Sequence, residues 1–491
     1  MPTADDGRVE LPASEVKELE RSPLYNEDLA PVPIAKRTWN TWDYAALWIS
    51  MAHCIPTYTM ASALIENGMS WWQALFTILL GNIIVLAPIL LNSHPGTKYG
   101  IPFPVFARAA YGTAGSNLAA LMRAVIACGW FGINAWIGGM ALQAFFTSIH
   151  PGWATLLGTF NGHPGTQWIS FLLFWGLNIL IIFKGMELVR RLERFAAPFV
   201  LVMTAALVVW AVWKAGGLGP IIHNGGKDGA FGRLFIPSLT ATIGFWSTLS
   251  LNMPDFTRFG RSQRQQAIGQ IVALPSTMTV FAGMGIMITS ATVIIYGKAI
   301  GDPILLGGMF SNRLVVGVVM FTIVVATLAV NIAANVVSPA NDFANAFPSK
   351  INFKRGGLIT GIIGIAMMPW ELYANASRYI GWLLGYSGSL GSIAGVLIVD
   401  YWVIRKKSLD LKGLYLRDGV YRYRNGWNHP AVIATLIGTA VALGGAFWAP
   451  MKAIYDWSWF IGFGLSGGIY YLLMRGAAPP TRLPEARIER A

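Results

Sequence analysis

Residues 118–146 read LAALMRAVIACGWFGINAWIGGMALQAFF, an apolar stretch of 29 residues whose one charged side chain is Arg123. A hydrocarbon core about 30 Å thick is crossed by about 20 apolar helical residues, so this stretch is long enough to span a membrane. Trp130 and Asn134 lie close to its middle and, at this spacing, share one helix face. The stretch predicts a membrane helix with aromatic and polar groups at its centre.

Similar apolar stretches recur on both sides of it, from near residue 43 to residue 474. Of the 491 residues, 54% are hydrophobic and 12% are charged, and the charged share is about half that of a soluble domain. A water-soluble fold is therefore excluded. The fold class that we predict is an all-α membrane protein embedded as one body.

Apolar windows place twelve membrane spans, with boundaries that are soft by several residues. Residues 1–42 and 475–491 are predicted to be an N-terminal and a C-terminal tail on either side of a transporter domain, 43–474. The spans fall near residues 43–66, 70–92, 118–146, 168–183, 195–213, 235–252, 265–297, 314–337, 357–374, 380–404, 430–450 and 454–474.

The positive charges alternate from loop to loop. With an even number of spans, both tails share one side with the loops after every second span, and these segments hold 28 of the 36 Lys and Arg. The opposite loops hold 7. The positive-inside rule therefore predicts cytoplasmic termini in a multi-pass inner-membrane protein. Because the charges are spread among loops and form no single basic face, we expect no nucleic-acid partner.

Three spans have features that can interrupt a helix: Pro56 in the first, Gly244 in the sixth, which runs into Asn252 and Pro254, and Asn331, Asn335 and Pro339 at the eighth. Broken helices are tolerated at membrane depth where the freed backbone is buried in protein or lines a cavity. The alternative is a simple proline kink. If spans 1–5 (43–213) and 6–10 (235–404) are inverted repeats, spans 1 and 6 are corresponding first helices, where such transporters place a discontinuous pair.

Trp130 and Trp246 both fall near mid-span, away from the interfaces where tryptophan usually anchors a membrane helix. Two indoles at this depth can stack on both faces of a flat ring. Asn134 and Asn335 need partners at this depth, and each carboxamide offers a donor beside an acceptor, the complement of a ring amide. The alternative is that these amides join helices, and that the indoles are packing residues.

His53 precedes Pro56 in span 1 and is a side chain that titrates near neutral pH. A neutral histidine bonded to backbone carbonyls is the alternative role. Arg123 and Asp400 are expected to snorkel or cap near span ends. The chain has no P-loop, no HExxH and no nucleophile with a base in the same span, so we expect no enzyme, no cofactor and no structural metal.

At these residues the chain resembles the nucleobase:cation symporter-1 family, and most closely its bacterial hydantoin and allantoin permeases. The likeness covers roughly residues 25–475. It rests on the segments NEDLAPV, KRTWNTWDYAALWISMAHCIPTYT, HPGTKYGIPFPVFARAAYG, GWFGINAWIGG, LNMPDFTRFGRS, VNIAANVVSPANDFANAFP, INFKRGG and DYWVIRKKSLDLKGLY.

The resemblance implies a LeuT-like five-plus-five inverted repeat, discontinuous helices 1 and 6, and two extra helices near 430–474. It also implies a planar substrate held between spans 1, 3, 6 and 8. Carried over by motif, the substrate-binding positions are Trp130, Asn134, Phe245, Trp246, Asn335 and Cys54. Cys54 departs from the amide expected there, which bears on substrate identity because a thiol cannot offer the same donor and acceptor pair.

At the positions of the family's sodium site, this chain departs further from the family's pattern. The resemblance places its backbone carbonyls at Ser50, His53 and Ala326 and its two hydroxyls at Ala329 and Val330. Neither of the last two carries a hydroxyl, and a hard cation needs several oxygen ligands. The sequence therefore favours proton-coupled or uncoupled transport over sodium coupling, with His53 as the responding group.

Together these observations predict a secondary transporter that imports a neutral planar heterocycle by alternating access. Allantoin or hydantoin ranks first, followed by uracil or cytosine. The expected partners are that small molecule and the lipid bilayer, the coupling ion is H⁺ or Na⁺, and the protein is expected to be a monomer. The alternatives are a sodium-coupled amino-acid transporter on the same fold and a ligand sensor that does not transport.

Overall fold

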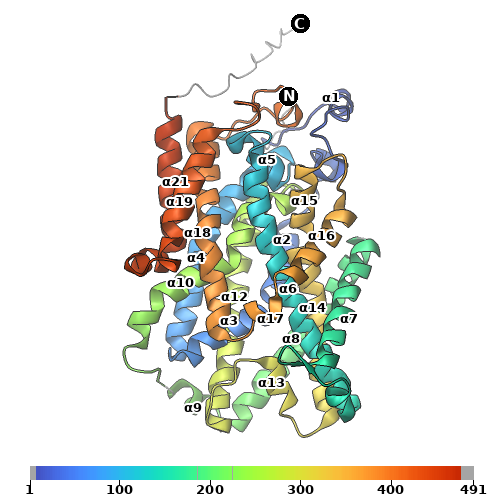
Figure 1. Ribbon diagram of the computed structural model, residues 1–491, viewed down its shortest axis with the longest axis vertical. Helices are drawn as coiled ribbons and strands as arrows, with labels where there is room; N and C mark the ends of the chain where they lie inside the picture. The colour runs from blue at the N-terminus through green and yellow to red at the C-terminus, as the bar shows by residue number, and fades with distance from the viewer. Residues whose placement is uncertain (1–6, 185, 224, 477–491) are drawn as a thin grey trace.

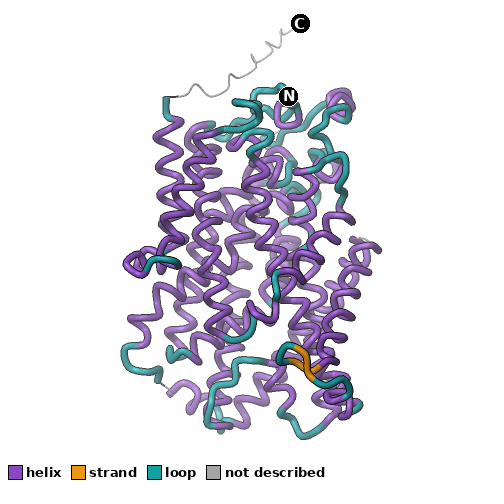
Figure 2. The backbone as a smooth tube through the Cα atoms, viewed as in Figure 1, coloured by secondary structure: helices purple, strands orange, loops and turns teal. Residues whose placement is uncertain are grey.

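The computed structural model describes residues 7–184, 186–223 and 225–476, which form one elongated bundle of helices (Figure 1). Helix α1 (Ala13–Leu19) lies at the same end of the bundle as the last turn of α21 (Ser458–Met474), and we call this the terminal end. The sole strands in the described residues, β1 (Thr159–Phe160) and β2 (His163–Pro164), form a small antiparallel hairpin near the opposite end (Figure 2).

Each of the twelve predicted spans coincides with a helix or with consecutive helices. These are α2 (Thr41–Ala52) with α3 (Ile55–Glu66), α4 (Trp71–Tyr99), α6 (Ser116–Ile149), α7 (Gly165–Lys184), α8 (Met186–Lys214), α10 (Ala230–Asn252), α12 (Gln263–Tyr296), α14 (Arg313–Asn335) with α15 (Val337–Ala346), α16 (Phe353–Ala366) with α17 (Pro369–Leu372), α18 (Ala376–Ile398) with the π-helical η4 (Val399–Ile404), α19 (His429–Leu443) with η6 (Gly444–Ala446), and α20 (Lys452–Asp456) with α21.

Eight of these segments are long and apolar enough to cross a membrane, judged over the described part of the chain, and α21 and residues 199–214 are shorter apolar helices. The first and ninth predicted spans are absent from this group because each is divided into two helices shorter than a membrane. These two spans are therefore absent because their helices are broken, and not because they are less apolar.

The predicted break in span 6 is wrong: α10 continues without interruption through Gly244 to Asn252. Gly244 has a different role. A Cβ atom at this position would lie 2.8 Å from the carbonyl oxygen of Leu383 and 3.1 Å from Cβ of Ser387, both on α18. The glycine therefore allows α10 and α18 to pack closely, and the chain changes helix only at Met253, before α11 (Pro254–Thr257).

Several elements lie in segments that the sequence left as tails or loops, mainly at the two ends of the bundle. They are α1, η1 (Glu27–Leu29), η2 (Ile34–Lys36), α5 (Phe103–Tyr111), η3 (Pro151–Thr155), α9 (Leu218–His223), α11, α13 (Pro303–Gly308), η5 (Gly413–Tyr415) and η7 (Ala449–Met451).

The described part of the predicted N-terminal tail packs against the bundle. Leu19 and Leu29 are fully buried, and Lys412 of the segment after η4 forms an ion pair with Glu18 at 2.7 Å. The hydrogen bond from Lys412 lowers the pKa of the Glu18 carboxyl. The predicted C-terminal tail lies outside the described residues from residue 477 onward.

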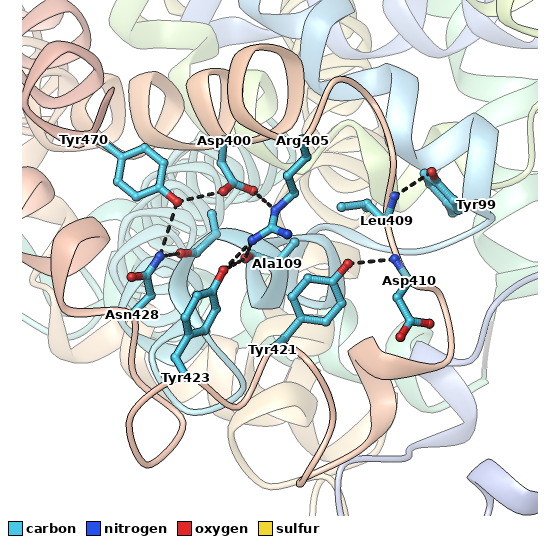
Figure 3. Close-up of polar contacts among 11 residues, drawn as sticks. Tyr99, Ala109, Asp400, Arg405, Leu409, Asp410, Tyr421, Tyr423, Asn428 and Tyr470 are labelled. Atoms are coloured by element: carbon cyan, nitrogen blue, oxygen red, sulfur yellow. Dashed lines mark hydrogen bonds and ion pairs between the residues drawn. The ribbon is translucent and has the colours of Figure 1, made fainter. Parts of the chain in front are cut away.

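Arg123 and Asp400 do not snorkel; both are completely buried in ion pairs near the terminal end. Arg123 pairs with Asp342 of α15 at 3.1 Å, and Asp400 pairs with Arg405 at 2.6 Å. Figure 3 shows Asp400 between Arg405 and Tyr470, whose hydroxyl donates to the carboxylate at 2.7 Å. Buried charges need partners such as these. The Arg123–Asp342 pair joins α6 to α15, whereas Asp400 and Arg405 belong to one segment, which the Tyr470 hydroxyl joins to α21.

Replacing Gly244 by alanine should destabilise the protein, because the added methyl group would overlap the α18 backbone. We expect Gly244→Ala to lower the free energy of unfolding by about 1–3 kcal/mol, the usual cost of overpacking. The measurement is the thermal unfolding midpoint of the detergent-solubilised protein.

Gly232→Ala is the matched control, because it lies in the same helix with no atom within 4 Å of its Cβ position. Alanine has the higher helix propensity, so this midpoint should stay the same or rise. Equal midpoints for the two variants would contradict the packing role of Gly244.

Candidate functional site

Span 1 is broken between His53 and Cys54. His53 has φ −84° and ψ 64° and ends α2, whereas Cys54 is extended and precedes α3. Pro56 explains the break, since proline has no N–H to continue the helical hydrogen bonds and its ring clashes with the preceding turn. The first of the three interruptions indicated by the sequence is therefore present.

Span 8 is interrupted in a similar way. Helix α14 ends at Asn335, Val336 has φ −115° and ψ −46°, and α15 begins at Val337. Pro339 lies where its missing N–H would have bonded the carbonyl of Asn335 in a continuous helix. Asn335 therefore sits at a helix end inside the bundle, where a polar side chain lies beside freed backbone groups.

Four aromatic side chains form a buried row between α6, α10 and α2. Phe245 contacts Trp130 and Trp246 edge to face, with ring centroids 5.2 and 4.8 Å apart. Trp48 of α2 contacts Trp246 in the same way at 5.1 Å. The two predicted indoles are thus brought together through Phe245 rather than placed face to face.

Two tyrosines of α18, which the sequence reading missed, hold this row in place. Tyr386 accepts a hydrogen bond from the Trp130 indole at 3.1 Å and donates to the Gly244 carbonyl at 2.9 Å. Tyr379 contacts the Trp130 ring at 6.0 Å and donates to the Pro56 carbonyl at 3.1 Å. Their spacing of seven residues could have revealed them in the sequence, because it puts two hydroxyls on one face of a membrane helix.

The predicted amides lie in two separate groups. Asn134 donates to the Trp130 carbonyl at 3.0 Å, and its own oxygen is buried without a hydrogen-bond partner in the described residues. Asn335 donates to Asn331 at 3.0 Å, and Asn331 donates to Asn178 of α7 at 3.1 Å. Asn331 thus joins two helices, whereas Asn134 keeps a free acceptor beside the aromatic row.

The indole nitrogen of Trp246 is also buried without a partner among the described side chains and backbone. A buried polar atom left unpaired costs about 1–3 kcal/mol. Unpaired donors on Trp48 and Trp246 and an unpaired acceptor on Asn134 therefore lie in or beside the aromatic row. The Cys54 thiol contacts the Thr57 hydroxyl at 3.3 Å, and Cys54 lines a cavity at the break in span 1.

A cavity of about 70 Å³ lies at the break in span 1 and is lined by His53 before the break and by Cys54 and Ile55 after it. His53 and Ala326 line it together with residues of α8 and α12. The Thr204 hydroxyl donates to the Val200 carbonyl at 2.9 Å, so it accepts from Nε2 of His53 at 3.3 Å. The cavity therefore joins the predicted coupling residue to α8, the helix of span 5.

Among the remaining predicted cation positions, Ala329 and Val330 have no side-chain oxygen. Ser50 lies half-buried on α2. Ala329 is buried against Val325, and Val330 is buried in the same core cluster as Trp130. Two cavity hydroxyls, Thr204 and Thr322, stand at other positions, and both donate to carbonyls within their own helices. No group of three His, Cys, Asp or Glu that could hold a metal ion occurs in the described residues.

With this geometry established, the chain was compared with known proteins. Residues 31–462 match a family described as permease for cytosine/purines, uracil, thiamine, allantoin. An allantoin permease of Bacillus subtilis (strain 168) is 41% identical, with 95% of this chain and 96% of the relative covered. The purine-uracil permease NCS1 of Arabidopsis thaliana is 38% identical over 92% of this chain and 78% of its own length.

The fold is also found among solved structures. A structure of Mhp1, described as a nucleobase-cation-symport-1 family transporter in a closed conformation with bromovinylhydantoin bound, superposes with a TM-score of 0.76. The two sequences are 22% identical, and the match covers 94% of this chain and 98% of the other. This likeness shows that the helices are arranged in the same fold.

Proposed function

Because this chain belongs to the nucleobase:cation symporter-1 family of permeases for cytosine/purines, uracil, thiamine and allantoin, we propose that it imports a neutral, planar amide heterocycle. Allantoin or hydantoin is the first substrate class, and uracil or cytosine the second. The name of the 41% identical Bacillus subtilis relative, allantoin permease, supports this order. The chain is accordingly a membrane transporter, and we assign it no enzymatic role.

The observation that carries the proposal is the aromatic row with its unpaired polar atoms. Trp130, Phe245 and Trp246 bring three flat rings together in the buried centre, while the indole N–H groups of Trp48 and Trp246 and the Asn134 oxygen lack partners in the described residues. A ring amide has an N–H beside a C=O, so it can satisfy one acceptor and one donor at once. The row's hydrogen bonds and ring contacts in the described chain involve no charged group, which favours an uncharged ring.

The two broken spans support alternating access. Spans 1 and 8 both change helix inside the bundle, at His53–Cys54 and at Val336, and discontinuous helices are where such transporters place their sites. We propose that repeat one (43–213) and repeat two (235–404) move relative to each other around this point. We further propose cytoplasmic termini in the plasma membrane, on the basis of the Lys and Arg distribution.

For the coupling ion we propose a proton. Ala329 and Val330 cannot supply the two hydroxyl ligands of the family's sodium site, and Ser50, His53 and Ala326 would offer backbone carbonyls alone. His53 lines the cavity beside the break and is bonded to α8 through Thr204. Gain of a proton there would add charge at the junction of spans 1 and 5, and would bias the position of one span against the other.

Replacing Trp130 by alanine should remove substrate binding. We expect allantoin or hydantoin to quench the tryptophan fluorescence of the purified protein saturably, and Trp130→Ala to weaken the apparent affinity at least about tenfold through lost ring contact and area. Sodium should leave the wild-type titration unchanged.

Trp213→Ala is the control for this titration, because Trp213 is 72% exposed on α8. It should lose fluorescence intensity but keep the wild-type affinity. Quenching strengthened by sodium would refute proton coupling. If none of allantoin, hydantoin, uracil and cytosine quenches the fluorescence, a sodium-coupled amino-acid transporter would be favoured instead.

Replacing His53 by glutamine should remove the pH dependence of transport. We expect uptake of labelled allantoin into proteoliposomes to rise as the external pH falls, and this rise should be lost in His53→Gln because glutamine does not titrate. His150→Gln, at an exposed histidine after α6, should keep the wild-type profile. An unchanged profile in His53→Gln would eliminate the proposed role.

A further inference from the structure

A second pocket, of about 210 Å³, opens at the terminal end, away from the aromatic row and the His53 cavity. It lies between the end of α4, the start of α12 and the turn after η4. The residues that line it include Arg8, His94, Lys98, Gln263, Lys406 and Lys407, and no acidic residue lines it in the described chain. The pocket therefore gathers positive charge from three separate segments, around Arg8, Lys98 and Lys406–Lys407.

The turn that carries Lys406 and Lys407 has a strained backbone. Their φ angles are 49° and 65°, in the left-handed region that residues with a side chain rarely occupy. Such conformations cost about 1–3 kcal/mol each and persist where the surroundings fix them, often at functional sites. Two adjacent lysines in this conformation are therefore an outlier that calls for an explanation.

The surroundings of the turn fix it on both sides (Figure 3). Before it, the Arg405 guanidinium bonds Asp400 at 2.6 Å and the Ala109 carbonyl at 2.7 Å. After it, the Leu409 N–H donates to the Tyr99 hydroxyl at 2.8 Å. Because the flanking residues are anchored to α4 and α5, the two lysines are held in place before any ligand binds.

The lysine charges in this pocket lack acidic partners. The Lys98 ammonium donates to the Lys407 carbonyl at 2.8 Å, and the Lys407 ammonium lies 5.5 Å from the Trp402 ring centroid. No carboxylate lies within ion-pair distance of Lys98, Lys406 or Lys407 in residues 7–184, 186–223 and 225–476. The lysine ammonium groups repel one another, and a bound anion would reduce this repulsion.

The pocket also lies at the border of the apolar surface. Val403 at the end of η4 and Ile271 on α12 are 50% and 49% exposed, as expected of side chains that face lipid. Trp402 is half-buried, its ring lies 5.5 Å from the Lys407 ammonium, and its indole donates to the Leu91 carbonyl at 3.1 Å. A tryptophan beside lysines at a span end is typical of the lipid headgroup level.

We propose that this pocket binds a phosphate group, carried either by an anionic phospholipid or by a soluble phosphate. Lys98, Lys406 and Lys407 supply the charge, and the fixed turn supplies the geometry. Basic pockets between membrane helices on the cytoplasmic side suit phosphate-bearing headgroups. The bound anion would join α4 of the predicted repeat one, α12 of repeat two and the segment after η4.

The test compares wild-type protein with the double variant Lys406→Gln/Lys407→Gln. The unfolding midpoint in detergent is followed against the concentration of dioctanoyl phosphatidylglycerol, dioctanoyl phosphatidylcholine or inorganic phosphate, at constant ionic strength. We expect phosphatidylglycerol or inorganic phosphate to raise the wild-type midpoint saturably. The double variant should bind that probe roughly 25-fold more weakly, at about fivefold for each lysine removed.

Lys350→Gln/Lys354→Gln is the matched control, because it removes the same charge from exposed positions at the terminal end, outside the pocket. It should keep the wild-type affinity. An effect of phosphatidylglycerol alone assigns the phosphate to lipid, and an equal effect of inorganic phosphate assigns it to a soluble source. Equal weakening in both double variants, or equal binding of phosphatidylcholine, would overturn the proposal.

If the double variant does not fold, Lys406→Gln alone is measured in the same way. The Lys406 side chain is exposed and takes part in no hydrogen bond or ion pair given by the described structure. Its expected loss is about fivefold in apparent affinity, and an unchanged affinity would count against the pocket.

Discussion

The unwound turn at His53 and Cys54 is the constraint on which the central part of this structure depends. A helix broken inside a membrane protein frees backbone groups that water cannot reach, so neighbouring side chains must satisfy them. Tyr379 donates to the Pro56 carbonyl in the first turn of α3, directly after the break, and Tyr386, two turns along α18, donates to the Gly244 carbonyl of the continuous helix α10. Because Tyr386 also accepts from Trp130, one face of α18 fixes spans 1, 3 and 6 around a common centre.

Two regions with different chemistry lie near the break. The first holds flat rings with unpaired donors on Trp48 and Trp246 and an unpaired acceptor on Asn134. The second is the cavity lined by His53 and Cys54, which Thr204 of α8 borders. A ring bound in the first region and a proton bound in the second would both act on the same few backbone bonds, so this arrangement supports coupling between them.

The sequence predicted the position of all twelve helical segments and the breaks at Pro56 and near Pro339, because apolar length and missing proline N–H groups are local properties. Gly244 was misread as a break because glycine permits both bending and close packing, and only the neighbouring α18 backbone decides between them. The family was recognised from ordered motifs, and the comparisons confirm it. Tyr379, Tyr386 and the partners of Arg123 and Asp400 were missed because their contacts join residues hundreds of positions apart.

The account's central claim is that a planar amide ring binds at the aromatic row and not in the His53 cavity. An experimental structure of the protein with allantoin bound tests this most directly. The account predicts ring density against Trp130 and Trp246, with a ring N–H within hydrogen-bond distance of the Asn134 oxygen. Density confined to the cavity beside His53 and Thr204, with the aromatic row unchanged, would contradict it.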